Sequence, residues 1–163
     1  MLNNMSVLQR RNYFRKHKFS NDDVMPYLSA HVHLYNKLNP DKKTNGYQSY
    51  KDAKHPKLSD TLADIIVIMI EKIVNGRKFY RYTDEWKNDF RSNAYLLLTK
   101  YVHNFRPETK NAIGYLYMSI ENAIIQELNA KKKLASRFVM CSLDEVEDIG
   151  EIPAPEEYDP LFA

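Results

Sequence analysis

Cysteine and glycine are both scarce in this chain. Among its 163 residues there are four glycines and a single cysteine, Cys141. One cysteine excludes a disulfide within the chain and a zinc site built on cysteine pairs. So few glycines argue against a glycine-rich phosphate loop and against a turn-dense all-β fold. No Walker or Rossmann glycine spacing is present.

Long hydrophobic runs are also missing. The longest apolar stretch, from Ile65 to Ile70, is far shorter than the roughly 20 residues that a membrane-spanning helix needs. The N-terminus carries a basic cluster with no apolar stretch before it, which is not the pattern of a signal peptide. The sequence therefore predicts a soluble intracellular protein without a membrane partner.

Charge is unevenly distributed along the chain, although the net charge is only +3. Residues 1–57 carry 11 basic and 4 acidic side chains, whereas residues 141–163 carry 8 acidic side chains and no basic one. A basic body favours a polyanionic partner through long-range attraction and counterion release. The acidic end could compete for the same surface or bind a separate partner. A plain solvated surface with a charged end explains the bias equally well.

Apolar periodicity predicts helices throughout, and no useful segment alternates as a strand would. The expected helices run from Ser20 or Asn21 to Asn36, from Ser59 to Asn75, from Thr83 to His103 or Asn104, and from Asn111 to Lys133. Ser59 or Asp60 and Thr83 are the expected N-caps. Gly76 is expected to adopt the left-handed conformation just past its helix.

The predicted fold class is all-α, a small helical bundle with an extended acidic C-terminal tail. Residues 1–57 form a basic N-terminal helix and loop, and residues 58–135 form the main helical domain. Residues 136–163 lose the helical period and contain three prolines, so they are expected to form a flexible acidic tail.

No catalytic or metal-binding pattern can be found. His31 and His33 lie two residues apart and would not face each other on a helix. Asp84 and Glu85 are the acidic first turn of a helix, where they complement its dipole. Cys141 lies in an acidic segment, which does not favour a reactive thiolate. We therefore expect a protein that is not an enzyme and that needs no metal or cofactor.

The polar face of the last predicted helix is the most informative feature. Hydrogen-bonding side chains recur there at steps of three and four residues, opposite the apolar stripe, and end in three lysines: Tyr115, Ser119, Asn122, Gln126, Asn129 and Lys131-Lys132-Lys133, flanked by Tyr117 and Met118. Amides can bind base edges, tyrosines can stack on unpaired bases, and lysines can hold phosphates. The alternative is a solvated face whose basic end complements the helix dipole.

Two further segments are candidates for protein contacts. The helix from Thr83 carries a polar row that includes Asp89, Ser92 and Asn93, which by itself would be solvated surface. The acidic tail ends in bulky apolar residues, Tyr158, Leu161 and Phe162. Such an anchor typically docks in an apolar pocket of a partner, although folding back onto the bundle is the alternative.

A group of residues in the main helical domain resembles a known family. The group comprises Tyr82-Thr83, Trp86-Lys87, His103-Asn104-Phe105, Glu108-Thr109-Lys110, Tyr115, Asn122-Ala123 and the lysine-rich helix end. This pattern is similar to the late-transcription sigma factors of T-even-type bacteriophages and, more distantly, to region 2 of bacterial primary sigma factors. The close similarity covers about residues 58–135. The acidic tail with its aromatic and leucine end matches in type.

The resemblance implies a role for each of the three candidate segments. Asp89, Ser92 and Asn93 would bind the β′ coiled coil of host core RNA polymerase. Tyr115 stands where sigma factors place a promoter-melting tyrosine, while Met118 and Ser119 stand where primary sigma factors have two tryptophans, which Tyr117 would partly replace. The DNA-binding set would thus be Tyr115, Tyr117, Ser119, Asn122, Gln126, Lys131, Lys132 and Lys133. Tyr158, Leu161 and Phe162 would bind the phage sliding clamp.

The function implied by the resemblance is that of a late-promoter sigma factor in the cytoplasm of an infected bacterium. It would bind core polymerase, recognise and melt a TATA-like minus-ten element, and contact the sliding clamp, with a late co-activator as a further partner. The alternative is a phage adaptor or anti-sigma protein that binds polymerase and clamp without reading DNA. Only the first of these needs the face from Tyr115 to Lys133.

Overall fold

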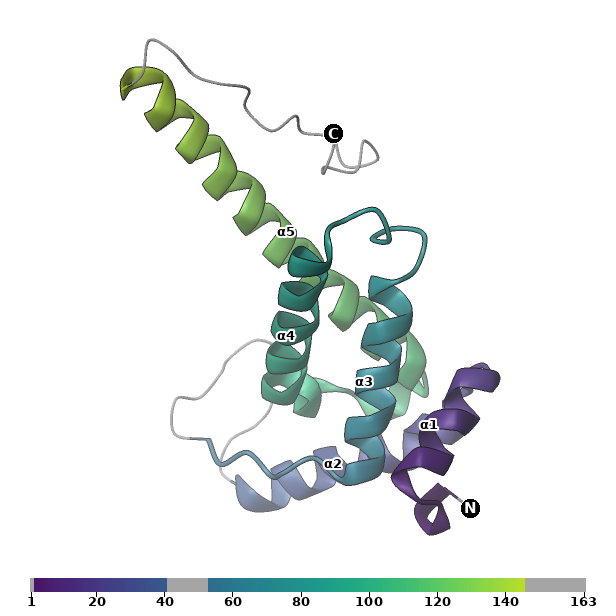
Figure 1. The fold of residues 1–163 in the computed structure, drawn as a ribbon. Helices are drawn as coiled ribbons and strands as arrows, with labels where there is room; N and C mark the ends of the chain where they lie inside the picture. Colours follow the sequence, from purple (N-terminus) through teal and green to yellow (C-terminus); the bar gives the residue numbers. More distant parts are fainter. Residues whose placement is uncertain (1, 41–52, 146–163) are drawn as a thin grey trace.

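The computed structural model describes residues 2–40 and 53–145, and these residues are helical with no strand. The helices are α1 (Val7–Lys16), α2 (Asn21–Leu38), α3 (Asp60–Val74), α4 (Asp84–Tyr101) and α5 (Ala112–Glu145), with short 3-10 turns η1 (Leu2–Asn4), η2 (Val102–Asn104) and η3 (Pro107–Thr109). Helices α3, α4 and α5 lie against one another, α2 crosses beneath them, and α1 flanks α3 (Figure 1). The predicted all-α bundle is therefore confirmed for the described residues.

Hydroxyl side chains begin α2, α3 and α4 where the sequence predicted them. Ser20 and Asp23 form a reciprocal capping box at α2. The Ser59 hydroxyl accepts a hydrogen bond from the Leu62 amide, and the Thr83 hydroxyl accepts one from the Trp86 amide. Each cap satisfies an amide that the helix itself cannot pair, which sets the first residue of the helix.

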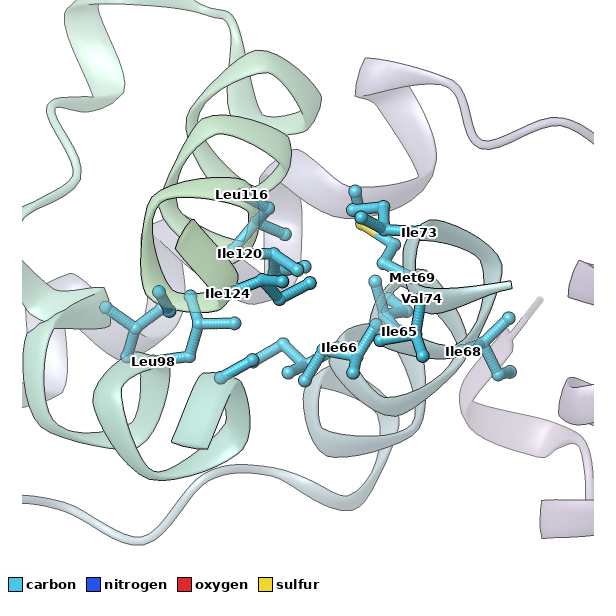
Figure 2. Packing of buried hydrophobic residues seen from close by; sticks show 14 of the residues in the cluster. Ile65, Ile66, Ile68, Met69, Ile73, Val74, Leu98, Leu116, Ile120 and Ile124 are labelled. Carbon is cyan, nitrogen blue, oxygen red and sulfur yellow. The ribbon is translucent and has the colours of Figure 1, made fainter. Parts of the chain in front are cut away.

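The core is an aliphatic cluster contributed mainly by α3, α4 and α5. Figure 2 shows α3 side chains facing Leu98 of α4 and the α5 row Leu116, Ile120 and Ile124, and these four α4 and α5 side chains are at most 2% exposed. Burial of one such side chain contributes roughly 1.5–3 kcal/mol. The apolar stripe of α5 is therefore committed to the core, which leaves its opposite face to the solvent.

Helix α1 was not predicted, because the first 19 residues show no apolar stripe. Its signal is local: Ser6 and Gln9 form a capping box, and Phe14 is fully buried. The Lys72 ammonium of α3 donates a 2.8 Å hydrogen bond to the Phe14 carbonyl at the end of α1. Contacts from a distant helix thus hold a segment whose own pattern is polar.

The prediction for Gly76 was wrong. Helix α3 ends at Val74, and its C-cap Asn75 has φ −89° and ψ 2°. The one non-glycine residue with positive φ in the described part of the chain is Lys110, at 53°. Gly76 stays outside the left-handed region. Its amide donates to the Ile73 carbonyl, and its carbonyl accepts from the Phe79 and Tyr80 amides. The chain leaves α3 through a tight turn instead of a left-handed cap.

The predicted start of the tail at residue 136 was wrong for its first ten residues, since α5 continues to Glu145. Leu128 is the last buried apolar residue of α5 among the described residues, and Lys131 still pairs with Asp89 of α4 before the helix projects outward (Figure 1). Phe138, further along α5, is 72% exposed. Strong helix formers such as Lys131–Leu134 favour continuation of the helix, which a search for apolar periodicity does not detect. Residues 146–163 lie outside the described residues.

Candidate nucleic-acid interface

The face of α5 opposite the core stripe is open to a partner. Met118 is 64% exposed, and Asn122, Gln126 and Lys133 lie in line with it at steps of four, four and seven residues. Tyr117 is 46% exposed but points to another side of the helix, about 140° around its axis from Asn122. Ser119 is half-buried at the edge of this row. We call Met118, Asn122, Gln126 and Lys133 the α5 face. The structure places the predicted residues Asn122, Gln126 and Lys133 on this side of α5 and Tyr117 on another side.

Tyr115 is not part of the α5 face. Its hydroxyl donates a 2.9 Å hydrogen bond to the Tyr101 carbonyl, and its half-buried ring lies 5.3 Å from that of Phe105. These contacts tie the start of α5 to the end of α4. Tyr115 therefore has a structural role, whereas Tyr117 presents an exposed ring for stacking.

A comparison of two matched variants separates these two tyrosines. Tyr115→Phe should lower the free energy of unfolding by about 1 kcal/mol, because the Tyr101 carbonyl loses its hydrogen bond. Tyr117→Phe should leave it unchanged within about 0.5 kcal/mol, since its ring is exposed. Urea unfolding followed by circular dichroism measures both values. Equal values would show that the Tyr115 hydrogen bond adds nothing to stability.

The three predicted lysines do not act alike. The Lys131 ammonium lies 2.5 Å from the Asp89 carboxylate of α4 and 5.4 Å from the centre of the Trp86 ring. Its side chain is accordingly mostly buried between α4 and α5. Lys132 and Lys133 lie further along α5, where the helix leaves the bundle. Lys133 is exposed and lies in line with the α5 face, so it is the best placed of the three to hold a phosphate.

The predicted polymerase-binding residues are divided between two sides of α4. Asp89 pairs with Lys131, and the Asn93 amide donates a 3.0 Å hydrogen bond to the Ala123 carbonyl, so both face α5. Ser92 is exposed on the side facing α3. Asp89 and Asn93 thus join two helices, although the Asp89 side chain is still 49% exposed, and Ser92 lies on the open side of α4.

Ser92 borders a groove between α3 and α4 that sequence analysis missed. Two adjoining hollows of about 580 and 280 Å³ share Tyr95, and their lining includes Leu96 and Val67. Leu96 is 65% exposed, although its helix, α4, packs against both α3 and α5. The sequence signal was present, since Tyr95 and Leu96 lie beside the apolar stripe of the helix rather than on it. This groove is suited to an apolar protein surface.

The connection between α3 and α4 is a second surface that sequence analysis missed. Its core residues Phe79 and Tyr82 are buried, while Arg77, Lys78 and Tyr80 are exposed. The Lys78 ammonium pairs with the Glu121 carboxylate of α5. The connection therefore lies beside the middle of α5, although 43 residues separate the two in sequence.

Three histidines and a tyrosine gather at the opposite end of the bundle. The His103 ring stacks on Tyr35 at 3.8 Å and lies 5.4 Å from His55. The His103 Nδ1 atom is buried without a hydrogen bond. Burial chiefly, and then the nearby His55 and His31, lower the pKa of His103 to about 4; burial, with His55, also lowers the pKa of His31. No group of three metal-ligating side chains occurs among the described residues.

Stability should therefore depend on pH through His103. Its ordinary pKa of 6.5 falls to about 4 in the folded chain, so the unfolded chain binds more protons between these values. The free energy of unfolding should fall as the pH is lowered from 6.5 to 4. His103→Phe keeps a ring on Tyr35 and should flatten this fall, whereas His33→Asn, at an exposed position, should not. Urea unfolding at several pH values tests this; equal slopes in all three proteins would contradict it.

Comparison with protein-family models, curated proteins and solved structures gives no match. Among the described residues, no helix is long and apolar enough to cross a membrane. The predicted clamp-binding residues Tyr158, Leu161 and Phe162 lie outside the described residues. The described residues thus define a class of molecule. It is an all-helical bundle with a polar α5 face and an apolar groove between α3 and α4.

Proposed function

We propose that the chain is a sigma factor of the region 2 type, similar to the late-transcription sigma factors of T-even-type bacteriophages. The observation that carries the proposal is the α5 face, where Asn122, Gln126 and Lys133 line up along a helix that also exposes the Tyr117 ring on another side. A partner that needs only protein contacts has no use for this combination of amides, an open ring and a lysine on one helix. Nucleic acid uses all three.

The length of the α5 face suits a short promoter element. From Met118 to Lys133 the helix rises by about 23 Å, at roughly 1.5 Å per residue. Successive bases on one strand of B-form DNA are spaced by about 3.4 Å, so the face spans about seven of them. We assign base contacts to Asn122 and Gln126, phosphate contact to Lys133, and stacking on an unpaired base to Tyr117. Strand separation then needs binding energy and no covalent chemistry.

Core RNA polymerase would bind on the other side of α4. A helical partner such as the β′ coiled coil can lay an apolar edge in the groove lined by Val67, Tyr95 and Leu96, with Ser92 at its margin. Asp89 and Asn93 act indirectly, because their contacts with α5 set the position of α4 relative to the DNA-binding face. Helices α4 and α5 would thus act as one rigid unit, with core polymerase bound on the α4 side and DNA on the α5 side.

Run-off transcription with bacterial core RNA polymerase and a TATA-like template tests the proposal. The full chain should produce a transcript, and Leu96→Glu should abolish binding to core polymerase in co-purification. Tyr117→Ala should retain core binding but lose activity on duplex template by about fivefold or more, as expected for the loss of one stacked base. A template with a pre-opened bubble should restore it. His33→Ala, on an exposed face of α2, is the control.

Two results would overturn the proposal. Binding to core polymerase without a transcript from any TATA-like template would identify an adaptor or anti-sigma protein. Failure of the bubble template to rescue Tyr117→Ala would remove the stacking role of Tyr117.

Tyr158, Leu161 and Phe162 remain proposed anchors for a sliding clamp, and a late co-activator remains a proposed partner. Deletion of residues 158–163 should remove clamp-stimulated transcription and spare basal initiation.

A further inference from the structure

The α3–α4 connection alternates buried anchors with exposed polar side chains. Phe79 is fully buried, and Tyr82 is 3% exposed. Their rings lie 6.1 and 5.6 Å from that of Phe90 in α4, both edge to face. Two further backbone hydrogen bonds, from the Tyr80 amide to the Gly76 carbonyl and from the Tyr82 amide to the Phe79 carbonyl, close the turn. The exposed side chains between these anchors are therefore held on a rigid frame.

The exposed side chains of this frame are basic and aromatic. Arg77, Lys78 and Arg81 are exposed, and residues 76–82 contain no acidic residue. Tyr80 is 51% exposed, its hydroxyl accepts a 2.9 Å hydrogen bond from the Arg81 guanidinium, and that guanidinium lies 5.5 Å from its ring centre. The nearest acids in sequence, Asp84 and Glu85, belong to the first turn of α4, where they complement its dipole. An arginine held against an open aromatic ring is a stacking platform with a cation attached.

The position of the connection relates it to the α5 face. The Lys78–Glu121 ion pair joins the connection to α5 one residue before Asn122. Figure 1 shows the connection where α5 passes the ends of α3 and α4, just before α5 leaves the bundle. Glu121 points about 40° around the helix axis from Tyr117 and about 100° from Asn122, so a strand that crosses α5 from Asn122 toward Tyr117 would meet the connection.

We propose that the α3–α4 connection is a second nucleic-acid contact, in which Arg77 and Arg81 hold phosphates and Tyr80 stacks on an unpaired base. The inference rests on the proposed function, because it extends the DNA-binding surface from α5 to a neighbouring element. It assigns a role to side chains that a folded core does not need. An acidic protein is the other partner that such a charge could attract, but it would make no use of the open Tyr80 ring.

Salt dependence of binding provides the test. Binding of the full chain to a fluorescein-labelled single-stranded oligonucleotide with a TATA-like sequence is measured by anisotropy at several salt concentrations. Removing one cation that neutralises a phosphate lowers the slope of log K against log salt by about 0.7 for single strands. Arg77→Ser/Arg81→Ser should therefore lower the slope by about 1.4. Tyr80→Ala should weaken binding by about fivefold or more with the slope unchanged.

The matched control is Lys37→Ser/Lys57→Ser, which removes the same charge from exposed positions away from the α3–α4 connection. It should leave the slope unchanged. If the two double variants lower the slope equally, the effect is one of net charge and the inference is wrong. If Arg77→Ser/Arg81→Ser binds the oligonucleotide like the parent but no longer binds core polymerase, the connection is a protein contact and the inference is also wrong.

The inference and the proposed function can fail separately. Transcription by the parent chain together with an unchanged slope in Arg77→Ser/Arg81→Ser would leave the sigma-factor proposal standing and remove the second contact. A lowered slope in that variant, from a parent chain that yields no transcript with core polymerase, would support the contact and remove the sigma-factor proposal. Circular dichroism of each variant confirms that its helices are intact.

Discussion

Asp64→Ala should lower the free energy of unfolding by about 3–5 kcal/mol, a large part of the roughly 5–15 kcal/mol that stabilises an ordinary domain. Asp64 of α3 accepts a 3.2 Å hydrogen bond from the Arg10 guanidinium of α1, and Arg11 approaches its other oxygen at 3.6 Å. The side chains of Arg10 and Asp64 are only 8% and 10% exposed. Without the carboxylate, Arg10 is left as a buried cation without its counter-ion, which is the costly outcome.

Glu71→Ala is the matched control for Asp64→Ala. Glu71 also lies on α3 and also pairs with an arginine, Arg91 at 2.9 Å, but the side chains of Glu71 and Arg91 are 51% and 30% exposed. An exposed pair contributes about 0.2–1 kcal/mol. Equal losses in the two variants, measured by urea unfolding, would contradict the role assigned to the buried pair. Arg10→Met/Asp64→Leu should recover much of the loss, because it removes both charges together.

Phe90→Ala should lower the free energy of unfolding by a similar amount, about 3–5 kcal/mol. Phe90 of α4 is fully buried and meets Phe79 and Tyr82 edge to face, so its removal leaves a cavity beside both rings. Those two rings anchor the α3–α4 connection. Trypsin should therefore cut faster after Arg77 and Arg81 in this variant than in the parent chain.

Tyr95→Ala serves as the control on the same helix. Tyr95 is 38% exposed and lines the groove between α3 and α4, so its removal should cost less than about 1 kcal/mol and leave trypsin cleavage unchanged. A loss below about 1 kcal/mol in Phe90→Ala would show that the three rings are not the anchor. Unchanged cleavage in a destabilised Phe90→Ala would show that the connection holds its shape without them.

Local signals in the sequence were enough to predict the main helices. The expected caps were Ser20 or Asn21, Ser59 or Asp60, and Thr83. Helices α2, α3 and α4 begin immediately after Ser20, Ser59 and Thr83. The core stripe of α5 followed from its period, because apolar residues three and four apart share one helix face. The same period predicted the polar α5 face, since the residues opposite a buried stripe must face the solvent or a partner. These are properties of one helix at a time.

Other local predictions failed because local preference was not what decided them. The segment from residue 136 was expected to be a tail, yet α5 continues to Glu145, well past its last buried apolar residue, Leu128. Gly76 was expected to be left-handed, but its carbonyl accepts the Phe79 and Tyr80 amides in a turn closed by Phe79 packing. Helix α1 has a polar pattern and is held by Asp64 and Lys72 of another helix.

The sequence by itself determined helices α2, α3 and α4, the side chains that cap their starts, and the apolar stripe of α5. The tertiary structure alone decided which side chains of different helices meet: Lys131 with Asp89, Asn93 with Ala123, and Tyr115 with Tyr101. These contacts give Lys131, Asn93 and Tyr115 partners inside the fold and leave each of them only partly exposed. The physical reason is that periodicity reports the direction of a side chain around its own helix axis. It carries no information about what lies opposite, which depends on how the packed core sets one helix against the next.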